Sequence, residues 1–338
     1  MENSCLSFKA DLLFENCYFS TSSATSSRLI PANDSMVATV EGIRGTFKGS
    51  AFSAYFVFGF NPYIPLKPLR ETTSPSRMRA WCTRLGISYK DVGDRQWMFV
   101  RPNNAFLSQR QEPKMSLITP NVDEEDCLQL EAPEMKPLRL PKKSKNQKKN
   151  IISCSVWGNE ISGQDCGDEA ATWICDYLQK DGYRMVYSGD NLEKRNVKPK
   201  QYSPIQNAQC VYQDSSPYHL LSQASIDDIN SRINKEVTVY NFRPNILVEG
   251  CMAFDEDCWD EIRIGTNVTF HYIEPCSRCL LPSVEPNTGE KDPEMEPFKT
   301  LQSFRAPRGT KSPNFGIMIS PNTEGWIQVG DPVYAFRK

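Results

Sequence analysis

The stretch EPCSRCLLPSVEPNTGEKDPEMEPFKTLQSFR, residues 274–305, contains a Cys-x-x-Cys pair formed by Cys276 and Cys279. Ser277 and Arg278 separate the two thiols. Such a pair is typical of a structural zinc site, a redox dithiol or part of a disulfide framework. An arginine between the cysteines is required by none of these, so the surrounding sequence has to decide among them.

Zinc needs four Cys or His ligands, but the chain has only His219 and His271 and no second Cys-x-x-Cys. A zinc site could still be assembled from Cys276, Cys279, His271 and one remote thiol. A redox dithiol requires a helix N-terminus, whereas LLPSVEP after the pair is typical of a strand and a turn. Two ordinary thiols at a strand end, one of them packed inward, explain the spacing equally well.

A further interpretation is a single thiolate that ligates a metal already held by sulfur ligands of its own cofactor. Arg278 would then have a purpose, because a guanidinium can donate two parallel hydrogen bonds to a phosphate or a ring acceptor. The spacing permits this interpretation and leaves the others open.

The composition excludes several classes of protein. The 338 residues suggest about two domains, and a net charge of −2 gives no reason to expect nucleic-acid binding. The 12 cysteines are scattered, which indicates free thiols in a reducing compartment.

No segment reaches the ~20 apolar residues of a membrane helix. Residues 50–60 are the most apolar, and a buried strand is favoured over an interfacial segment.

Short β-rich runs separated by turns predict a mixed α+β fold that is mainly β. Two helices are expected, over residues 168–183 and 224–233, with Asp168 and Ser225 as their N-caps. In the first, an apolar face combines Ala171, Ile174, Cys175 and Leu178. The strands expected after the second helix, the first of them over residues 237–250, predict a barrel or sandwich.

We expect an irregular segment at residues 1–60, a first domain at 61–188 and a second at 189–338. The basic run at residues 136–150 is expected to be a solvated loop.

Four other segments carry polar groups suited to an anionic ligand. They are YIPLKP with Lys67, GDRQW with Arg95, QDSSP with Asp214, Ser215 and Ser216, and NFRPN with Arg243 and Asn245. Each has an ordinary structural explanation, because such residues cap turns, bond loop carbonyls or stack on neighbouring rings.

Taken together, these segments resemble the MOSC superfamily and, within it, the mitochondrial amidoxime reducing component. The resemblance runs from about residue 63 to the C-terminus and is carried by GDRQWMFV, FLSQRQEPKMSLI, CSVWGNEISGQDCGDEAATWI, NFRPNILVEG, FDEDCWDEIRIG, PCSRC, VEPNTGE, TLQSFR, SPNFGIMI and IQVGDPVY. It implies an N-terminal β-barrel-like MOSC domain followed by a MOSC β-barrel domain with a few short helices.

The resemblance also implies a molybdenum cofactor, Mo-molybdopterin, with Cys279 as the protein ligand of the metal. Asp214 would lie near the metal as a catalytic residue. The implied cofactor-binding residues are Lys67, Arg95, Ser215, Ser216, Arg243, Asn245, Ser277 and Arg278. Lys67 matches the family segment imperfectly, because Pro68 stands where the family has serine and Ile64 is inserted before Pro65.

The function implied is reduction of N-hydroxylated compounds such as amidoximes, hydroxylamines and N-oxides. The chain has no GxGxxG dinucleotide motif and no ferredoxin cysteine spacing. The electrons must then come from outside, and the resemblance implies a cytochrome b5-type donor with its NADH-dependent reductase. The basic run at residues 142–149 is a candidate docking patch. The alternatives are a molybdenum cofactor carrier or sulfuration module and a zinc-stapled module without activity.

The resemblance further implies a monomer in mitochondria, on the cytosol-facing side of the outer membrane, or in the cytosol if no anchor is present. Pyridoxal phosphate binding comes with the family only, through sulfurases that carry a separate domain for it.

Overall fold

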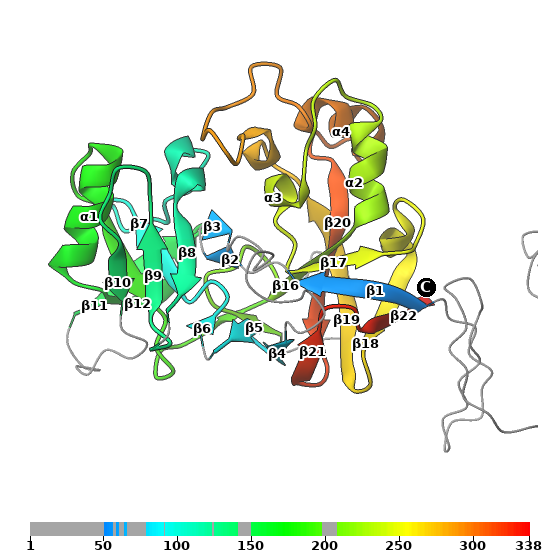
Figure 1. Cartoon of the computed structure of the whole chain (residues 1–338), viewed down its shortest axis with the longest axis horizontal. Coiled ribbons are helices and arrows are strands. Elements are labelled where there is room, and N and C mark those ends of the chain that lie inside the picture. The colour runs from blue at the N-terminus through cyan, green and yellow to red at the C-terminus, as the bar shows by residue number, and fades with distance from the viewer. Residues whose placement is uncertain are drawn as a thin grey trace, which may run out of the picture. The chain divides into compact units, whose positions relative to one another are not determined.

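The computed structural model describes residues 51–56, 59–60, 64–65, 79–90, 92–123, 125–140, 150–197 and 208–338, with backbone alone before residue 79. Lys67 and the basic run at residues 142–149 lie outside the described residues. The described part is mainly β with short helices, so the predicted fold class is confirmed (Figure 1).

A closed barrel contains seven strands in the order β1-β17-β16-β20-β19-β18-β22. Their bounds are β1 (Ala51–Phe56), β16 (Tyr218–Ser222), β17 (Ile246–Glu249), β18 (Trp259–Ile264), β19 (Val268–Ser277), β20 (Asn314–Pro321) and β22 (Pro332–Arg337). β16 and β17 run parallel, and the other barrel pairs are antiparallel. The prediction of a strand within residues 50–60 is confirmed for β1.

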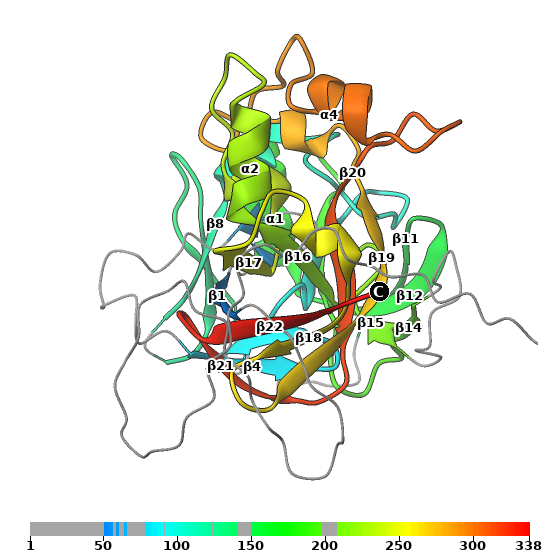
Figure 2. The same ribbon diagram turned by 90° about the vertical axis from the view of Figure 1, so that its right-hand side faces the viewer.

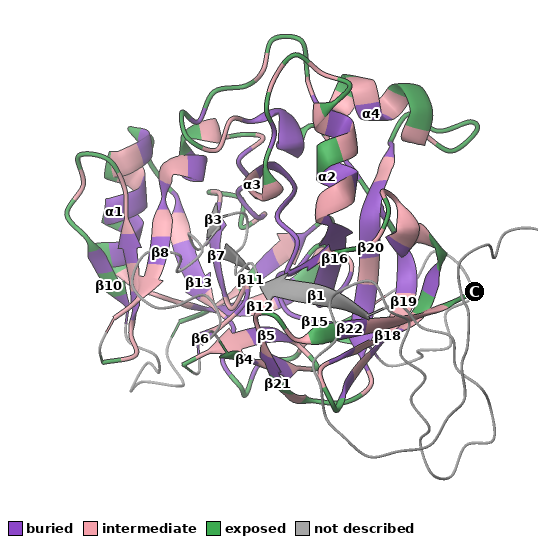
Figure 3. Cartoon of the chain, turned by 45° about the vertical axis from the view of Figure 1, so that its right-hand side comes forward, coloured by how far each residue is buried: buried purple, intermediate pink, exposed green. Residues whose placement is uncertain are grey.

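Buried apolar side chains from β16, β17, β18, β19, β20 and β22 form one core cluster. On β18 the side chains of Trp259, Ile262 and Ile264 are buried, while Asp260 is exposed. Tyr218 and Phe270 meet edge to face in the core, with ring centroids 5.2 Å apart. Figure 3 shows the buried residues along β16, β19 and β20. A continuous apolar core therefore holds the strands whose ends carry the candidate site.

Three helices lie at one end of the barrel (Figures 1 and 2). They are α2 (Gln223–Asn230), α3 (Val239–Phe242) and α4 (Phe298–Arg305), and they share an apolar cluster with Phe315 of β20. The helix predicted at residues 224–233 is found as α2. Its N-cap is Ser222 rather than Ser225, because the Ser222 hydroxyl accepts the Ser225 N–H. The predicted strand over residues 237–250 is wrong in its first half, which forms α3.

The described part of the chain before residue 190 contains two further sheets of three or four strands. One has the order β11-β12-β13-β7, and the other has the order β10-β9-β8. Their bounds are β7 (Trp97–Val100), β8 (Thr119–Val122), β9 (Leu128–Glu131), β10 (Leu138–Leu140), β11 (Ile151–Val156), β12 (Asn159–Asp165) and β13 (Arg184–Tyr187). Helix α1 (Asp168–Leu178) packs on them and confirms the predicted helix in a shorter form. The residue preceding it, Gly167, occupies the N-cap position that was predicted for Asp168.

Another sheet joins sequence-distant segments in the order β21-β4-β5-β6. Its strands are β4 (Arg79–Thr83), β5 (Gly86–Tyr89), β6 (Val92–Gly93) and β21 (Gly325–Gln328). The remaining elements are β2 (Gly59–Phe60), β3 (Ile64–Pro65), β14 (Arg195–Asn196), β15 (Gln209–Cys210), η2 (Pro113–Leu117), η3 (Asp255–Cys258) and η4 (Leu281–Ser283). Because β1 and β21 both pair across the middle of the sequence, the division at residues 61–188 and 189–338 stays a prediction.

Candidate functional site

A cavity of about 480 Å³ collects the polar segments that the sequence analysis selected. All the predicted site residues except Lys67 line it, namely Arg95, Asp214, Ser215, Ser216, Arg243, Asn245, Ser277, Arg278 and Cys279. They come from four separate stretches of sequence. The grouping is a geometric fact, while the role of each residue in binding a cofactor stays a prediction.

The two thiols of the Cys-x-x-Cys pair face different surroundings. Cys276, on β19, is buried, whereas Cys279 follows the strand and is half-buried against the apolar cluster that includes Leu281. A register shift between Pro275 and Ser277 in the β19–β20 pair, where β19 ends, accompanies this change. Burial raises the pKa of the Cys276 thiol, although the charge of Arg278 opposes the rise. The expectation that one thiol packs inward is therefore confirmed.

The side chain of Arg278 is buried and is partly engaged with the protein itself. One terminal nitrogen donates to Cys276 Sγ at 3.0 Å, and the other donates to the Phe242 carbonyl at 2.9 Å. Its Nε is buried and has no hydrogen-bond partner. The two terminal nitrogens of the guanidinium therefore bind Cys276 and α3. The sequence analysis expected them to donate to an anionic ligand instead.

Arg243 occupies the C-cap of α3 in the left-handed conformation, with φ of 57°. A capping box between Thr238 and Asn241 holds the start of the same short helix. The buried guanidinium of Arg243 donates to Gln109 Oε1 at 2.6 Å. Since Gln109 lies 134 positions earlier, this charged bond connects an early part of the sequence to an arginine that lines the cavity.

Asn245 lines the cavity although only 1% of it is exposed, and its amide bonds two neighbouring residues. Its Nδ2 donates to Asp94 Oδ2 at 2.9 Å, and its Oδ1 accepts the His219 N–H at 2.9 Å. Asp94 also forms an ion pair with Arg95. A buried carboxylate is costly unless it is paired and hydrogen-bonded, so Asn245 and Arg95 together stabilise Asp94 and hold each other in place.

His219 lines the cavity as a neutral imidazole. Burial lowers its pKa well below the usual value, and the charges of Arg278 and Arg95 lower it further. Its Nε2 is buried and has no hydrogen-bond partner. A Cβ on Gly316 would lie 2.5 Å from that atom, and Gly316 has φ of 77°. Only glycine at this point of β20 lets the imidazole reach its position.

The segment QDSSP, which carries Ser215 and Ser216, is held in place by hydrogen bonds to its backbone and to the side chain of Gln213. Arg195 donates to the carbonyls of Val211, at 2.9 Å, and Gln213. The Gln213 amide donates to the Leu85 carbonyl at 2.6 Å. Ser216 donates to the Ile319 carbonyl of β20 at 2.7 Å. This leaves its oxygen able to accept a bond from the cavity side.

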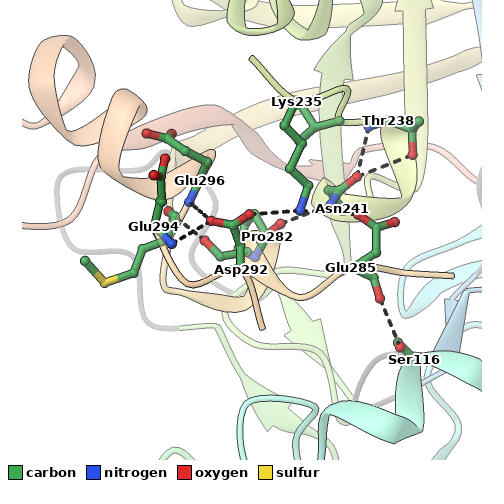
Figure 4. A network of polar contacts seen from close by, with 12 residues as sticks. Ser116, Lys235, Thr238, Asn241, Pro282, Glu285, Asp292, Glu294 and Glu296 are labelled. Atoms are coloured by element: carbon green, nitrogen blue, oxygen red, sulfur yellow. Dashed lines mark hydrogen bonds and ion pairs between the residues drawn. The ribbon is translucent and has the colours of Figure 1, made fainter. Parts of the chain in front are cut away.

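The chain just after Cys279 is braced by the polar network of Figure 4. Asn241 donates to the Pro282 carbonyl of η4 at 3.1 Å. Lys235 pairs with Asp292 at 3.2 Å and with Glu285 at 3.3 Å. Ser116 of η2 donates to the Glu285 carbonyl at 3.4 Å. The thiol-bearing segment is therefore held by α3 and by a residue from the first part of the sequence.

Comparison with known proteins agrees with this architecture. Residues 64–181 match the MOSC N-terminal beta barrel domain, and residues 207–334 match the MOSC domain. The chain is 41% identical over 273 residues to mitochondrial amidoxime reducing component 2 of Bos taurus, covering 79% of this chain and 80% of that protein. It is 37% identical to the human components 2 and 1, at the same coverage. The chain belongs to the amidoxime reducing component family.

The excess of positive charge around the cavity suits an anionic ligand. Four arginines line it, against the carboxylates of Asp214 and Glu274. The four are Arg95, Arg110, Arg243 and Arg278. Buried cations need compensating charge or acceptors, and Nε of both Arg110 and Arg278 has no partner. The donor set therefore fits a phosphate-bearing pterin cofactor. In the described part of the chain, no three His, Cys, Asp or Glu side chains form a metal-binding cluster.

Several cavity residues of this family member were not selected from the sequence. Trp157, His219 and Glu274 line the cavity, and Asp94 and Gln109 hold its arginines. Gln109, Arg110 and Trp157 lie in segments that resemble the family. The sequence therefore pointed to these segments, but it did not indicate what the three residues do. Asp214 is exposed and accepts a 2.7 Å hydrogen bond from Trp157 Nε1.

Proposed function

We propose that this protein is a molybdenum-cofactor reductase of N-hydroxylated compounds, with Cys279 as the metal ligand. One observation carries the proposal: Cys279 shares a single cavity with Arg95, Arg243 and Arg278. The names of the relatives, which are amidoxime reducing components, support the same activity.

The cavity residues divide into two kinds of ligand for such a cofactor. The guanidinium groups of Arg95, Arg243 and Arg278 would offset its phosphate charge, and the hydroxyls of Ser215, Ser216 and Ser277 would bond its polar edges. Asn245 positions these groups by holding Asp94 and His219. When bound, molybdopterin supplies a two-electron redox centre at a metal coordinated by its dithiolene.

The overall reaction consumes R–NHOH, two electrons and two protons, and yields R–NH₂ and water. The N–O bond breaks as the two electrons are taken up. The oxygen, which already carries one hydrogen, gains one proton and leaves as water, and the nitrogen takes up the other proton. Asp214 stands on the cavity wall with its carboxylate fixed by Trp157, so we assign it the delivery of a proton to the departing oxygen. His219, held neutral by burial, adds no further positive charge beside the arginines.

The electrons would come from a cytochrome b5-type protein and its NADH-dependent reductase. We also propose a mitochondrial location, because the relatives are named as mitochondrial components. Placement on the cytosol-facing side of the outer membrane is part of this proposal. Within the described ranges, the structure has no helix with the length and apolar character needed to cross a membrane.

The test combines element analysis with turnover. Cys279→Ser should lose both bound molybdenum and benzamidoxime reduction with NADH, cytochrome b5 and its reductase. Cys258→Ser removes an exposed thiol outside the cavity and is the matched control. Molybdenum without amidoxime turnover in the wild-type protein would favour a carrier or sulfuration role. Full molybdenum content in Cys279→Ser would refute the ligand assignment.

A further inference from the structure

Trp157 stands at the tip of a two-residue hairpin turn between β11 and β12, where Val156 pairs with Asn159. Trp157 and Gly158 both have positive φ, 53° and 77°, as a type I′ turn requires. Asn, Asp or Gly occupies such positions without strain, whereas a bulky aromatic residue there is an outlier. Something other than the turn must account for this tryptophan.

Three contacts hold the indole in one orientation. Its Nε1 donates to Asp214 Oδ1 at 2.7 Å, which joins the hairpin to the serine-bearing segment. The Arg110 guanidinium carbon lies 4.3 Å from the ring centroid, and the Phe106 ring centroid lies 4.8 Å away. Despite these contacts, 45% of Trp157 stays exposed. The ring is therefore fixed in position but not buried.

The exposed indole belongs to the same cavity as Cys279. Leu281 and Phe242 add apolar surface to that cavity, while the arginines and Asp214 supply its polar groups. A tryptophan that served only as packing would gain stability from burial, and this one leaves 45% of its surface exposed. A rigid, partly exposed indole that lines the same cavity as the candidate metal ligand is instead suited to stack on a flat ligand.

We propose that Trp157 is a stacking shelf that makes this protein prefer N-hydroxylated substrates carrying a flat aromatic group. This inference rests on the proposed reductase function and adds the substrate class. Arg110 and Asp214 position the shelf, so that little side-chain entropy is lost when a ring settles on it. The amidoxime end of such a substrate would extend toward Cys279, and its aryl end would lie on the indole.

The experiment compares benzamidoxime with acetamidoxime, which differ by the aromatic ring. In Trp157→Asn, which fits the left-handed turn, the ratio of kcat/KM for benzamidoxime over acetamidoxime should fall roughly two- to tenfold, the effect of one aromatic stacking pair. The fall should appear mainly in KM. Trp157→Phe should bring the ratio back toward the wild-type value, because it restores a ring without the indole N–H.

Trp326→Asn is the matched control, because Trp326 is 55% exposed on β21 and does not line this cavity. The stacking role of Trp157 would be refuted if the benzamidoxime-to-acetamidoxime ratio of kcat/KM stayed constant in Trp157→Asn. It would also be refuted if that ratio fell equally in the control.

Calorimetric binding of the products separates this proposal from the function. If the wild-type protein reduces neither amidoxime, the reductase proposal fails while the shelf can still be judged. Benzamidine should then bind more tightly than acetamidine, and Trp157→Asn should weaken benzamidine binding roughly two- to tenfold. Equal binding of benzamidine by wild type and Trp157→Asn would refute the shelf independently of turnover.

Discussion

Glu256 of η3 offers a quantitative test of the structure, because its carboxyl is fully buried. Oε1 accepts the Ser222 N–H at 3.2 Å and the Ser225 hydroxyl at 2.8 Å, whereas Oε2 is buried without a partner. Burial raises the pKa of Glu256, and the hydrogen bonds from the two serines offset only part of the rise. The carboxyl therefore joins α2 to η3, and its ionisation in the folded state is unfavourable.

The raised pKa belongs to the folded state, so protonated Glu256 contributes stability that is complete below the unfolded pKa of about 4.3. This contribution is lost as the pH rises through the folded pKa. Between the two values the folded state holds one more proton than the unfolded state. The free energy of unfolding should therefore fall by about 1.4 kcal/mol per pH unit through this one group.

The assay measures urea unfolding of wild type and Glu256→Gln at half-unit steps from pH 4 to 8. The glutamine amide places NH₂ where Oε2 lacked a partner, which adds a pH-independent cost of about 1–3 kcal/mol. The observable is therefore the slope of the difference between the two proteins. Glu290→Gln, which removes an exposed carboxyl, is the control. A wild-type-minus-variant difference that does not fall with rising pH would show that Glu256 ionises as it does in water.

Three further substitutions probe the cavity. Asn245→Ala removes the acceptor of the buried His219 N–H and should cost about 1–3 kcal/mol in thermal unfolding, with lower molybdenum content. Gly316→Ala places a Cβ 2.5 Å from His219 Nε2 at positive φ, and should lower the urea midpoint by the equivalent of about 2 kcal/mol or more. Gln109→Leu removes a charged hydrogen bond of Arg243 and should cost about 1.5–3 kcal/mol. Unchanged midpoints in any of these variants would contradict the contacts described.

The sequence predicted the kinds of element better than their ends. The helix from Asp168 was visible because apolar residues recur at helical spacing, yet it stops at Leu178, where Gln179 takes a left-handed conformation. No turn residue announced that stop. Helix α3 was taken for a strand because Val239 and Tyr240 favour strands locally, and the capping box of Thr238 overrides that preference.

For the candidate site, the sequence identified cavity residues but not the groups that hold them. Arg95 and Arg243 stood in recognisable segments, and both line the cavity. Their acceptors, Asp94 and Gln109, could not be chosen, because a buried acceptor has no signal until the chain folds and brings it within bonding distance. Trp157 was hidden for a different reason, since its turn would ordinarily select asparagine or glycine.

The placement of these acceptors bears on how the cavity could hold a charged ligand at all. Cys279 and Arg243 belong to the region that matches the MOSC domain, whereas Asp94 and Gln109 belong to the region that matches the N-terminal domain. A buried guanidinium without its acceptor is destabilising, so the C-terminal region alone would keep the thiol and Arg243 but lose Gln109, the acceptor of Arg243. It would also lose Arg95 together with its partner Asp94. The Cys-x-Arg-Cys motif is therefore not sufficient for a ligand site by itself. Residues of both matched regions are needed to form the cavity that it lines.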